Sequence, residues 1–155
     1  MAKLWQQTGY SQLRRGRYSE SGRIYLVTAV AEMRRPVFMD WQSASIACRT
    51  FTNAKLLGDA RLLCWVLMPD HVHWLLQLEE QTELAVLVGK LKAVTSRNIG
   101  TAVWQSGFHD RAIRHEEDVL PAARYIVANP LRAGLVRRVG DYPYWDAMWL
   151  QTDRD

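Results

Sequence analysis

Two histidines one residue apart interrupt an apolar stretch of this chain. They are His71 and His73 in MPDHVHWLL, which covers residues 68–76. In a β-strand, alternate side chains point to opposite faces, so both imidazoles would share one face, with Val72 on the other. Two buried imidazoles are costly without polar partners, but with a third ligand the same pair can chelate a metal ion. The spacing therefore indicates a metal site if another segment supplies that ligand.

A tyrosine and an asparagine near the C-terminus could complete such a site. Tyr125 and Asn129 are four residues apart, which places them on the same face of a helix. The amide oxygen of Asn129 could bind a metal ion, and the oxygen of Tyr125 could act as a nucleophile. The spacing also fits a simpler interpretation, in which Tyr125 is an amphipathic boundary residue and Asn129 ends the helix before Pro130.

The hydrophobic pattern predicts the elements that would position these residues. β-Branched and aromatic residues predict strands over residues 23–31, 60–69, 71–79 and 107–114. End signals predict helices over residues 40–57, 82–99 and 115–130, with Thr82 as the cap of the second helix and the stop of the third at Asn129–Pro130. The Pro69–Asp70 pair predicts a tight turn, so the histidines should begin a strand beside a central one.

The order of these elements predicts the fold class. Strand, helix, strand, strand, helix, strand matches the split βαβ arrangement of ferredoxin-like domains. We therefore predict an α+β fold, an antiparallel sheet with helices on one face, followed by a C-terminal helix that carries Tyr125. Residues 1–22 are polar and basic without a period, so we expect a basic N-terminal arm over 1–22 and a single catalytic domain over 23–155. This fold hosts many functions and does not by itself indicate an activity.

Composition restricts the class of protein. The chain has 155 residues, is 48% hydrophobic and carries a formal net charge of +4, which suits a polyanionic partner without requiring one. Neither a membrane span nor a signal peptide is apparent, so we expect a cytoplasmic protein without a membrane partner. Cys48 and Cys64 lie in apolar surroundings and are expected to be buried free thiols.

Three blocks in order carry a resemblance to a known family. They are HVH at 71–73, WQSGFHDRAIRHEEDV at 104–119 and YIVANPLRAGLV at 125–136, preceded by GYSQLRRGRYSESGRIYLVTAVAEMRRPVF at 9–38. Together they resemble the single-tyrosine HUH transposases, and more closely the REP-associated tyrosine transposases of bacteria. The resemblance extends from about Gly9 to Tyr144.

The resemblance implies a function and a role for each matching residue. His71 and His73 match the metal-binding HUH pair, Tyr125 the nucleophile and Asn129 the third metal ligand. The implied activity is metal-dependent endonuclease and strand transfer on single-stranded DNA at the hairpins of repetitive extragenic palindromes, through a 5′-phosphotyrosine, in the cytoplasm with the nucleoid. Oxygen and neutral nitrogen ligands with open positions suit Mg²⁺ or Mn²⁺. A monomer, or a homodimer that shares the site between chains, would be compatible with the sequence.

Several other residues could contact DNA. Arg14, Arg15 and Arg17 could grip a hairpin or form a solvated basic arm; Lys90, Lys92 and Arg97 could line a helix beside the site or a plain polar helix face. His109 could contact metal or phosphate or be an ordinary strand histidine, and Asp70 could be a ligand or a turn residue.

Alternative functions are a non-catalytic hairpin-binding protein and a HUH nuclease of the replication or relaxase type. An unrelated metal hydrolase is disfavoured, since no HExxH motif is present.

Overall fold

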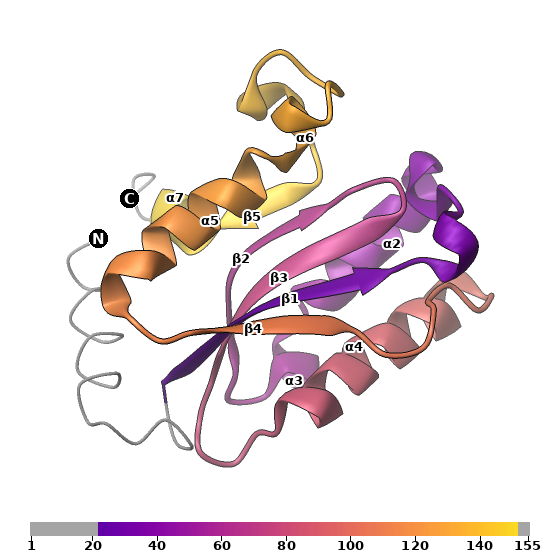
Figure 1. The fold of residues 1–155 in the computed structure, drawn as a ribbon. Helices are drawn as coiled ribbons and strands as arrows, with labels where there is room; N and C mark the ends of the chain where they lie inside the picture. The colour runs from indigo at the N-terminus through magenta and orange to yellow at the C-terminus, as the bar shows by residue number, and fades with distance from the viewer. Residues whose placement is uncertain (1–21, 152–155) are drawn as a thin grey trace.

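The computed structural model describes residues 22–151, which form an antiparallel sheet with helices against both faces (Figure 1). The sheet order is β4-β1-β3-β2-β5. The strands are β1 (Arg23–Val30), β2 (Arg61–Leu67), β3 (His71–Leu78), β4 (His109–Ile113) and β5 (Trp145–Ala147). The order of β1 to β4 is that of a ferredoxin-like sheet, so the predicted fold class is confirmed.

The helices follow the order expected from the sequence. They are α2 (Trp41–Phe51), α3 (Ala54–Leu57), α4 (Leu84–Ile99), α5 (Val119–Val127), α6 (Asn129–Arg132) and α7 (Met148–Gln151). Short 3₁₀ turns are η1 (Glu32–Arg34), η2 (Val37–Met39), η3 (Glu116–Asp118) and η4 (Val139–Asp141). None of the helices in residues 22–151 is long and apolar enough to cross a membrane.

Alternation along β3 divides the core into two apolar clusters. Val72 and Trp74 belong to the cluster that α2 and α4 cover, where the Trp74 ring packs edge-on against Phe51 with centroids 5.1 Å apart. Leu75 belongs to the second cluster, on the face that α5 covers. Figure 1 shows α2 and α4 on one side of the sheet and α5 on the other. Because His71 and His73 have the parity of Leu75, they lie on the α5 face.

Three predicted helices differ from the structure for local reasons. The helix expected over 40–57 is interrupted at Thr52, and α3 starts anew because the Asn53 side chain accepts hydrogen bonds from the backbone N–H groups of Lys55 and Leu56. The prediction that Thr82 caps α4 is wrong, since α4 begins at Leu84 and the Thr82 hydroxyl donates to Asp59 instead. The helix expected over 115–130 divides into η3, α5 and α6.

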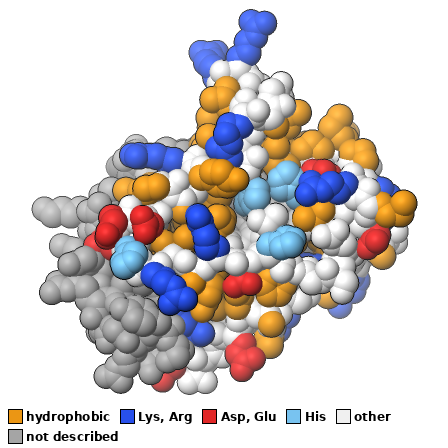
Figure 2. Space-filling model, in the orientation of Figure 1, with side chains coloured by type: hydrophobic (Ala, Val, Ile, Leu, Met, Phe, Trp, Pro, Cys, Tyr) orange, Lys and Arg blue, Asp and Glu red, His pale blue; other side chains and the backbone are white. Residues whose placement is uncertain are grey.

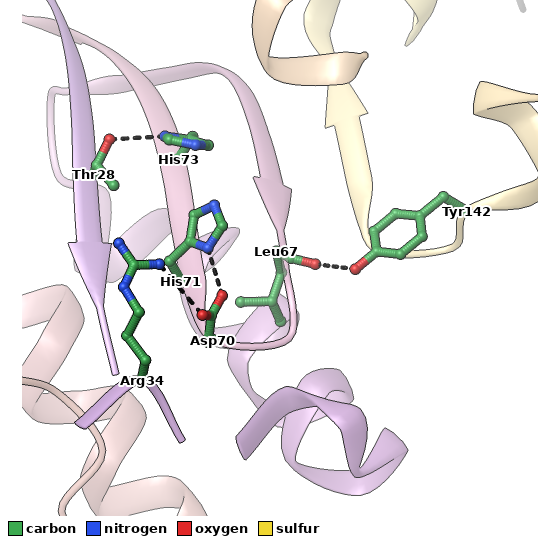
Figure 3. Close-up of polar contacts among 7 residues, drawn as sticks. All are labelled: Thr28, Arg34, Leu67, Asp70, His71, His73 and Tyr142. Carbon is green, nitrogen blue, oxygen red and sulfur yellow. Dashed lines mark hydrogen bonds and ion pairs between the residues drawn. The ribbon is translucent and has the colours of Figure 1, made fainter. Parts of the chain in front are cut away.

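The C-terminal region adds a strand that the sequence pattern did not predict. β5 pairs antiparallel with the outer edge of β2, with Cys64 opposite Ala147. The hydroxyl of Tyr142 donates to the carbonyl oxygen of Leu67 at 2.5 Å, at the end of β2 (Figure 3). Both cysteines are free, Cys64 buried and Cys48 half-buried. The predicted division into an arm over 1–22 and a domain over 23–155 stays a prediction, since residues 1–21 lie outside the described part.

Candidate metal and tyrosine site

The two histidines stand side by side at the start of β3. His71 is opposite Val30 and His73 opposite Thr28 in the register with β1. Their ring centroids are 4.9 Å apart, and the ring planes are inclined by 79°. His73 is buried, with 9% of its surface exposed, whereas His71 is half-buried. The prediction that both imidazoles share one face of a strand is confirmed.

Each imidazole is held by a hydrogen bond at its Nδ1 atom (Figure 3). The Nδ1 of His71 is 2.7 Å from Oδ1 of Asp70, and the Nδ1 of His73 is 2.8 Å from Oγ1 of Thr28. An ionised carboxylate can only accept, so His71 donates its Nδ1–H to Asp70, and Nε2 is the ring nitrogen left for a metal ion. The Thr28 hydroxyl can accept from His73 in the same way. Such partners at the second ring nitrogen are the usual support of metal-binding histidines.

Burial and neighbouring charges lower the pKa values of two groups at the site, His73 and Asp70. Burial, assisted by His71 and Arg132, lowers the pKa of His73 to about 4, so this ring is neutral at physiological pH. Burial alone would raise the pKa of Asp70, but hydrogen bonds and charge from His71 and Arg34 outweigh it and hold the pKa below its usual value. Arg34 Nη1 lies 3.3 Å from Asp70 Oδ2. Both Asp70 oxygens are therefore engaged, which favours a supporting role over direct ligation.

Tyr125 extends from α5 toward the histidines of its own chain. Its ring centroid lies 6.2 Å from that of His73, and half of its surface is exposed. Arg132 covers the ring, with its guanidinium carbon 4.1 Å from the ring centroid, and donates from Nη2 to the Tyr125 carbonyl oxygen at 2.9 Å. A half-exposed phenol beside two imidazoles is accessible to a substrate, unlike a tyrosine that only fills the core.

Asn129 is the first residue of α6 rather than the last of α5. The interpretation that it ends the Tyr125 helix is thus wrong: Ala128 keeps a helical backbone conformation and the chain turns on into α6. The residue is half-buried, and within the described residues its side chain makes no hydrogen bond. An uncommitted amide close after Tyr125 is compatible with ligation, and this role stays a prediction.

The predicted basic residues of α4 do not lie beside the histidines. Lys90, Lys92 and Arg97 stand on a helix whose apolar side packs on the opposite face of the sheet, which excludes the first of the two alternatives, a position beside the site. Both crossovers of a split βαβ unit place their helices on one face, and the histidine pair points to the other. Lys92 donates to the carbonyl oxygens of Gln105 and Gly107, which anchors the segment before β4. Arg14, Arg15 and Arg17 lie outside the described residues.

Three further residues belong near the site on geometric grounds. Thr28 and Arg132 contact His73 and Tyr125, and neither was singled out from the sequence. The sequence offered two signals for these residues. One is a threonine within the apolar strand RIYLVTAV, and the other is an arginine seven residues after Tyr125. His109 is exposed and pairs with Thr28 across β4 and β1, which places it on the same face as His73. Figure 2 shows histidine and basic side chains on this face of the molecule.

The donor set fits a divalent cation that prefers oxygen and neutral nitrogen. Within residues 22–151, no group of three His, Cys, Asp or Glu side chains could hold a metal ion. The two imidazoles, supported at Nδ1 by Asp70 and Thr28, could bind a metal ion through Nε2. A third protein ligand would then be an amide, and substrate or water would take the further positions. This set differs from the closed thiolate sites of structural zinc.

Comparison with known proteins agrees with this arrangement. A family model described as "Transposase IS200 like" matches residues 20–126. The chain belongs to the IS200-like transposase family. Membership supports a transposase-like function on DNA, and the match includes the histidine pair and Tyr125.

Individual relatives belong to the branch that the sequence resembles. A REP-associated tyrosine transposase of Escherichia coli (strain K12) is 30% identical over 82 residues, which cover 52% of this chain and 50% of the relative. A Haemophilus influenzae protein provisionally given the same name is 30% identical over 94 residues, covering 50% of this chain and 53% of the relative. The chain thus matches about half the length of these curated relatives.

A solved structure extends the similarity over more of the fold. It is the structure of a REP-associated tyrosine transposase bound to a REP hairpin, with a TM-score of 0.69 and 26% identity, and the match covers 83% of this chain and 79% of that one. The resemblance to this branch is therefore confirmed.

Proposed function

We propose that this protein is a metal-dependent endonuclease and strand transferase for single-stranded DNA, with Tyr125 as the nucleophile. One observation carries the proposal: Tyr125 lies beside His73. His73 is one of two neighbouring histidines whose Nδ1 atoms are each hydrogen-bonded, His71 to Asp70 and His73 to Thr28. An imidazole pair that serves only packing would not need a half-exposed tyrosine at its side. The roles of His71, His73 and Asn129 as ligands of Mg²⁺ or Mn²⁺ are part of this proposal.

The proposed reaction is a transesterification at one phosphodiester. The oxygen of Tyr125 attacks phosphorus, the bond from phosphorus to the 3′ oxygen breaks, and a 5′-phosphotyrosine and a free 3′-OH result. The phenolic proton leaves to solvent, which reaches the half-exposed ring, and the departing 3′ oxygen takes up a proton. A bound divalent ion would withdraw charge from a non-bridging phosphate oxygen and orient the scissile bond. Attack by a 3′-OH on the phosphotyrosine reverses the chemistry and rejoins the strands.

The proposed substrate is a hairpin of a repeated palindrome with single-stranded DNA beside it. The relative bound to a REP hairpin supports this choice, as does the net charge of +4. Arg14, Arg15 and Arg17 remain the proposed contacts to the hairpin, and we propose that the protein acts in the cytoplasm on nucleoid DNA. Since Tyr125 and the histidines of one chain already lie together, we propose that a monomer contains a complete site.

Covalent capture tests the proposal. The protein is incubated with labelled single-stranded DNA carrying the palindromes of its host, with Mg²⁺ or Mn²⁺ or with EDTA. We expect a denaturant-resistant adduct that requires metal and that the Tyr125→Phe variant cannot form, although this variant still binds the hairpin. Hairpin binding without any adduct would identify a non-catalytic binding protein, and an undiminished adduct from Tyr125→Phe would exclude Tyr125 as the nucleophile.

A further inference from the structure

A groove on the α5 face of the sheet has Tyr125 among its lining residues. It has a volume of ≈ 680 Å³ and is formed between α5 and the edge strand β4. Arg111 of β4 and Leu26 of β1 are opposite each other in the register, and both line the groove. Pro121 and Ala122 of α5 line it from the other side. Tyr125 thus belongs both to the lining of this groove and to the surroundings of His73.

The chemistry of the groove suits a nucleotide chain. Arg111 and Arg114 line it and are exposed, and within the described residues neither side chain makes a hydrogen bond or an ion pair. Leu26, Pro121 and Ala122 supply apolar surface against which a base can lie. Uncommitted arginines beside apolar surface match the alternating phosphates and bases of a single strand. Figure 2 shows basic side chains interspersed with hydrophobic ones on this face.

The size and the acidic end of the groove limit what it can hold. Its volume falls within the ~300–1,000 Å³ of small-molecule sites, which suits a few nucleotides and not a duplex. Asp118, the last residue of the acidic turn η3, lines the groove and would repel a phosphate. The DNA backbone is therefore expected beside Arg111, since the carboxylate disfavours it at η3.

We propose that this groove binds the single-stranded nucleotides adjoining the scissile phosphate, and that Arg111 and Arg114 contact their backbone. The inference rests on the proposed function, because it takes Tyr125 as the group that meets the scissile phosphate. It adds a binding site for one flank of the substrate, separate from the hairpin. Binding in this groove would align the strand, so that the phosphate next to the bound flank lies at Tyr125.

The test measures binding, so that it does not depend on cleavage. The Tyr125→Phe variant is titrated with labelled hairpin oligonucleotides that carry a short flank on the 5′ side, on the 3′ side or on neither, at several salt concentrations. We expect one flank to tighten binding about tenfold. The Arg111→Ala and Arg114→Ala double substitution should remove most of this gain and lower the salt slope by ~0.7 per lost phosphate contact, without weakening binding of the hairpin alone.

Control variants distinguish binding in this groove from a general effect of positive charge on DNA affinity. Arg49→Ala removes an exposed arginine of α2, on the opposite face of the sheet, and should leave the flank effect unchanged. Arg111→Lys should keep part of the gain, because it retains the charge. The proposal is overturned if neither flank adds affinity, or if the double variant weakens flanked and unflanked hairpins equally. If the wild-type protein forms no adduct but the flank effect still depends on the two arginines, the proposed cleavage chemistry is refuted and the proposed groove is not.

Discussion

The carboxylate of Asp70 lies 2.7 Å from Nδ1 of the histidine that follows it in the chain, His71. Arg34 binds the other oxygen of the same carboxylate, so the ring of His71 is attached through Asp70 to η1. Thr28 holds His73 in a corresponding way from β1. The orientation of both rings is thus set by neighbours that would not themselves touch a metal ion.

Removal of these supporting groups should weaken metal binding without abolishing it. We expect Asp70→Ala to reduce Mn²⁺ affinity ~10–100-fold, the range found when partners of metal-binding histidines are removed. Asp70→Asn should lose less, because the amide oxygen can still accept from Nδ1–H. Titration of Mn²⁺ by electron paramagnetic resonance measures this directly. Equal affinities for the wild-type protein and Asp70→Ala would show that the hydrogen bond does not support a ligand.

Loss of either histidine should abolish cleavage. His71→Ala and His73→Ala each leave a single imidazole with the Asn129 amide, which holds a hard divalent ion poorly. Adduct yield with Mg²⁺ or Mn²⁺ is the measurement. His109→Ala is the matched control, since His109 lies on the same face but is not one of the pair, and this variant should retain metal affinity. Cleavage in EDTA at the metal-supplemented rate would contradict the proposed site.

Arg132 should influence the rate of adduct formation more than it influences metal affinity. Its guanidinium covers the Tyr125 ring, and such contacts contribute ~0.5–2 kcal/mol. We expect Arg132→Lys, which keeps the charge but loses the planar contact, to slow adduct formation roughly fivefold at saturating DNA. Arg137→Lys, at an exposed position further along, serves as the control. An unchanged single-turnover rate would show that Arg132 does not position the phenol.

Acid should destabilise the protein through His73. The unfolded chain binds a proton at this residue near the ordinary histidine pKa of 6.5, whereas the folded chain does so only near 4. Stability should therefore fall as pH decreases from about 6.5 to 4, by up to ~3–4 kcal/mol at about 1.4 kcal/mol per pKa unit. Asp70 adds a further loss only at lower pH, below the ordinary aspartate value of 3.8, because its pKa is lowered in the folded state. Urea midpoints across this range should fall less steeply for His73→Gln than for the wild-type protein; parallel curves would contradict the assignment.

The order of elements and the histidine pair were predictable because they depend on local periodicity. The alternation of His71 and His73 with Val72 and Trp74 fixes which side chains share a face, and the strand and helix order fixes a split βαβ sheet. The choice between the two alternatives for Lys90, Lys92 and Arg97 depends on which face of the sheet α4 covers. The alternation along the strand already indicates this face. The apolar Trp74 must pack against the helices that follow the split βαβ order, so the histidines must point to the other face of the sheet.

Other features depend on contacts distant in the chain. Thr28 meets His73 only through the register of β1 with β3, and β5 forms because β2 has a free edge to which residues 145–147 return. The break of the first helix at Asn53, in contrast, is a capping signal that was visible in the sequence. Arg132 contacts Tyr125 because α6 follows directly after α5. A helix predicted to stop at Asn129–Pro130 gives no reason to expect this contact.

The packing of α5 has a consequence for the fate of a cut strand. Ala122, Ala123 and Ile126 bury one side of this helix on the sheet, and Tyr125 projects from it beside the histidines. A DNA end joined to Tyr125 would stay attached to this helix, and it could move away from the histidines only if the helix unpacked from the sheet. Its effective concentration at the histidines would stay high, whatever the concentration of protein in the cell. Rejoining would then be limited by the arrival of a 3′-OH, so the competition between available DNA ends, rather than encounter with the protein, would decide which strands are joined.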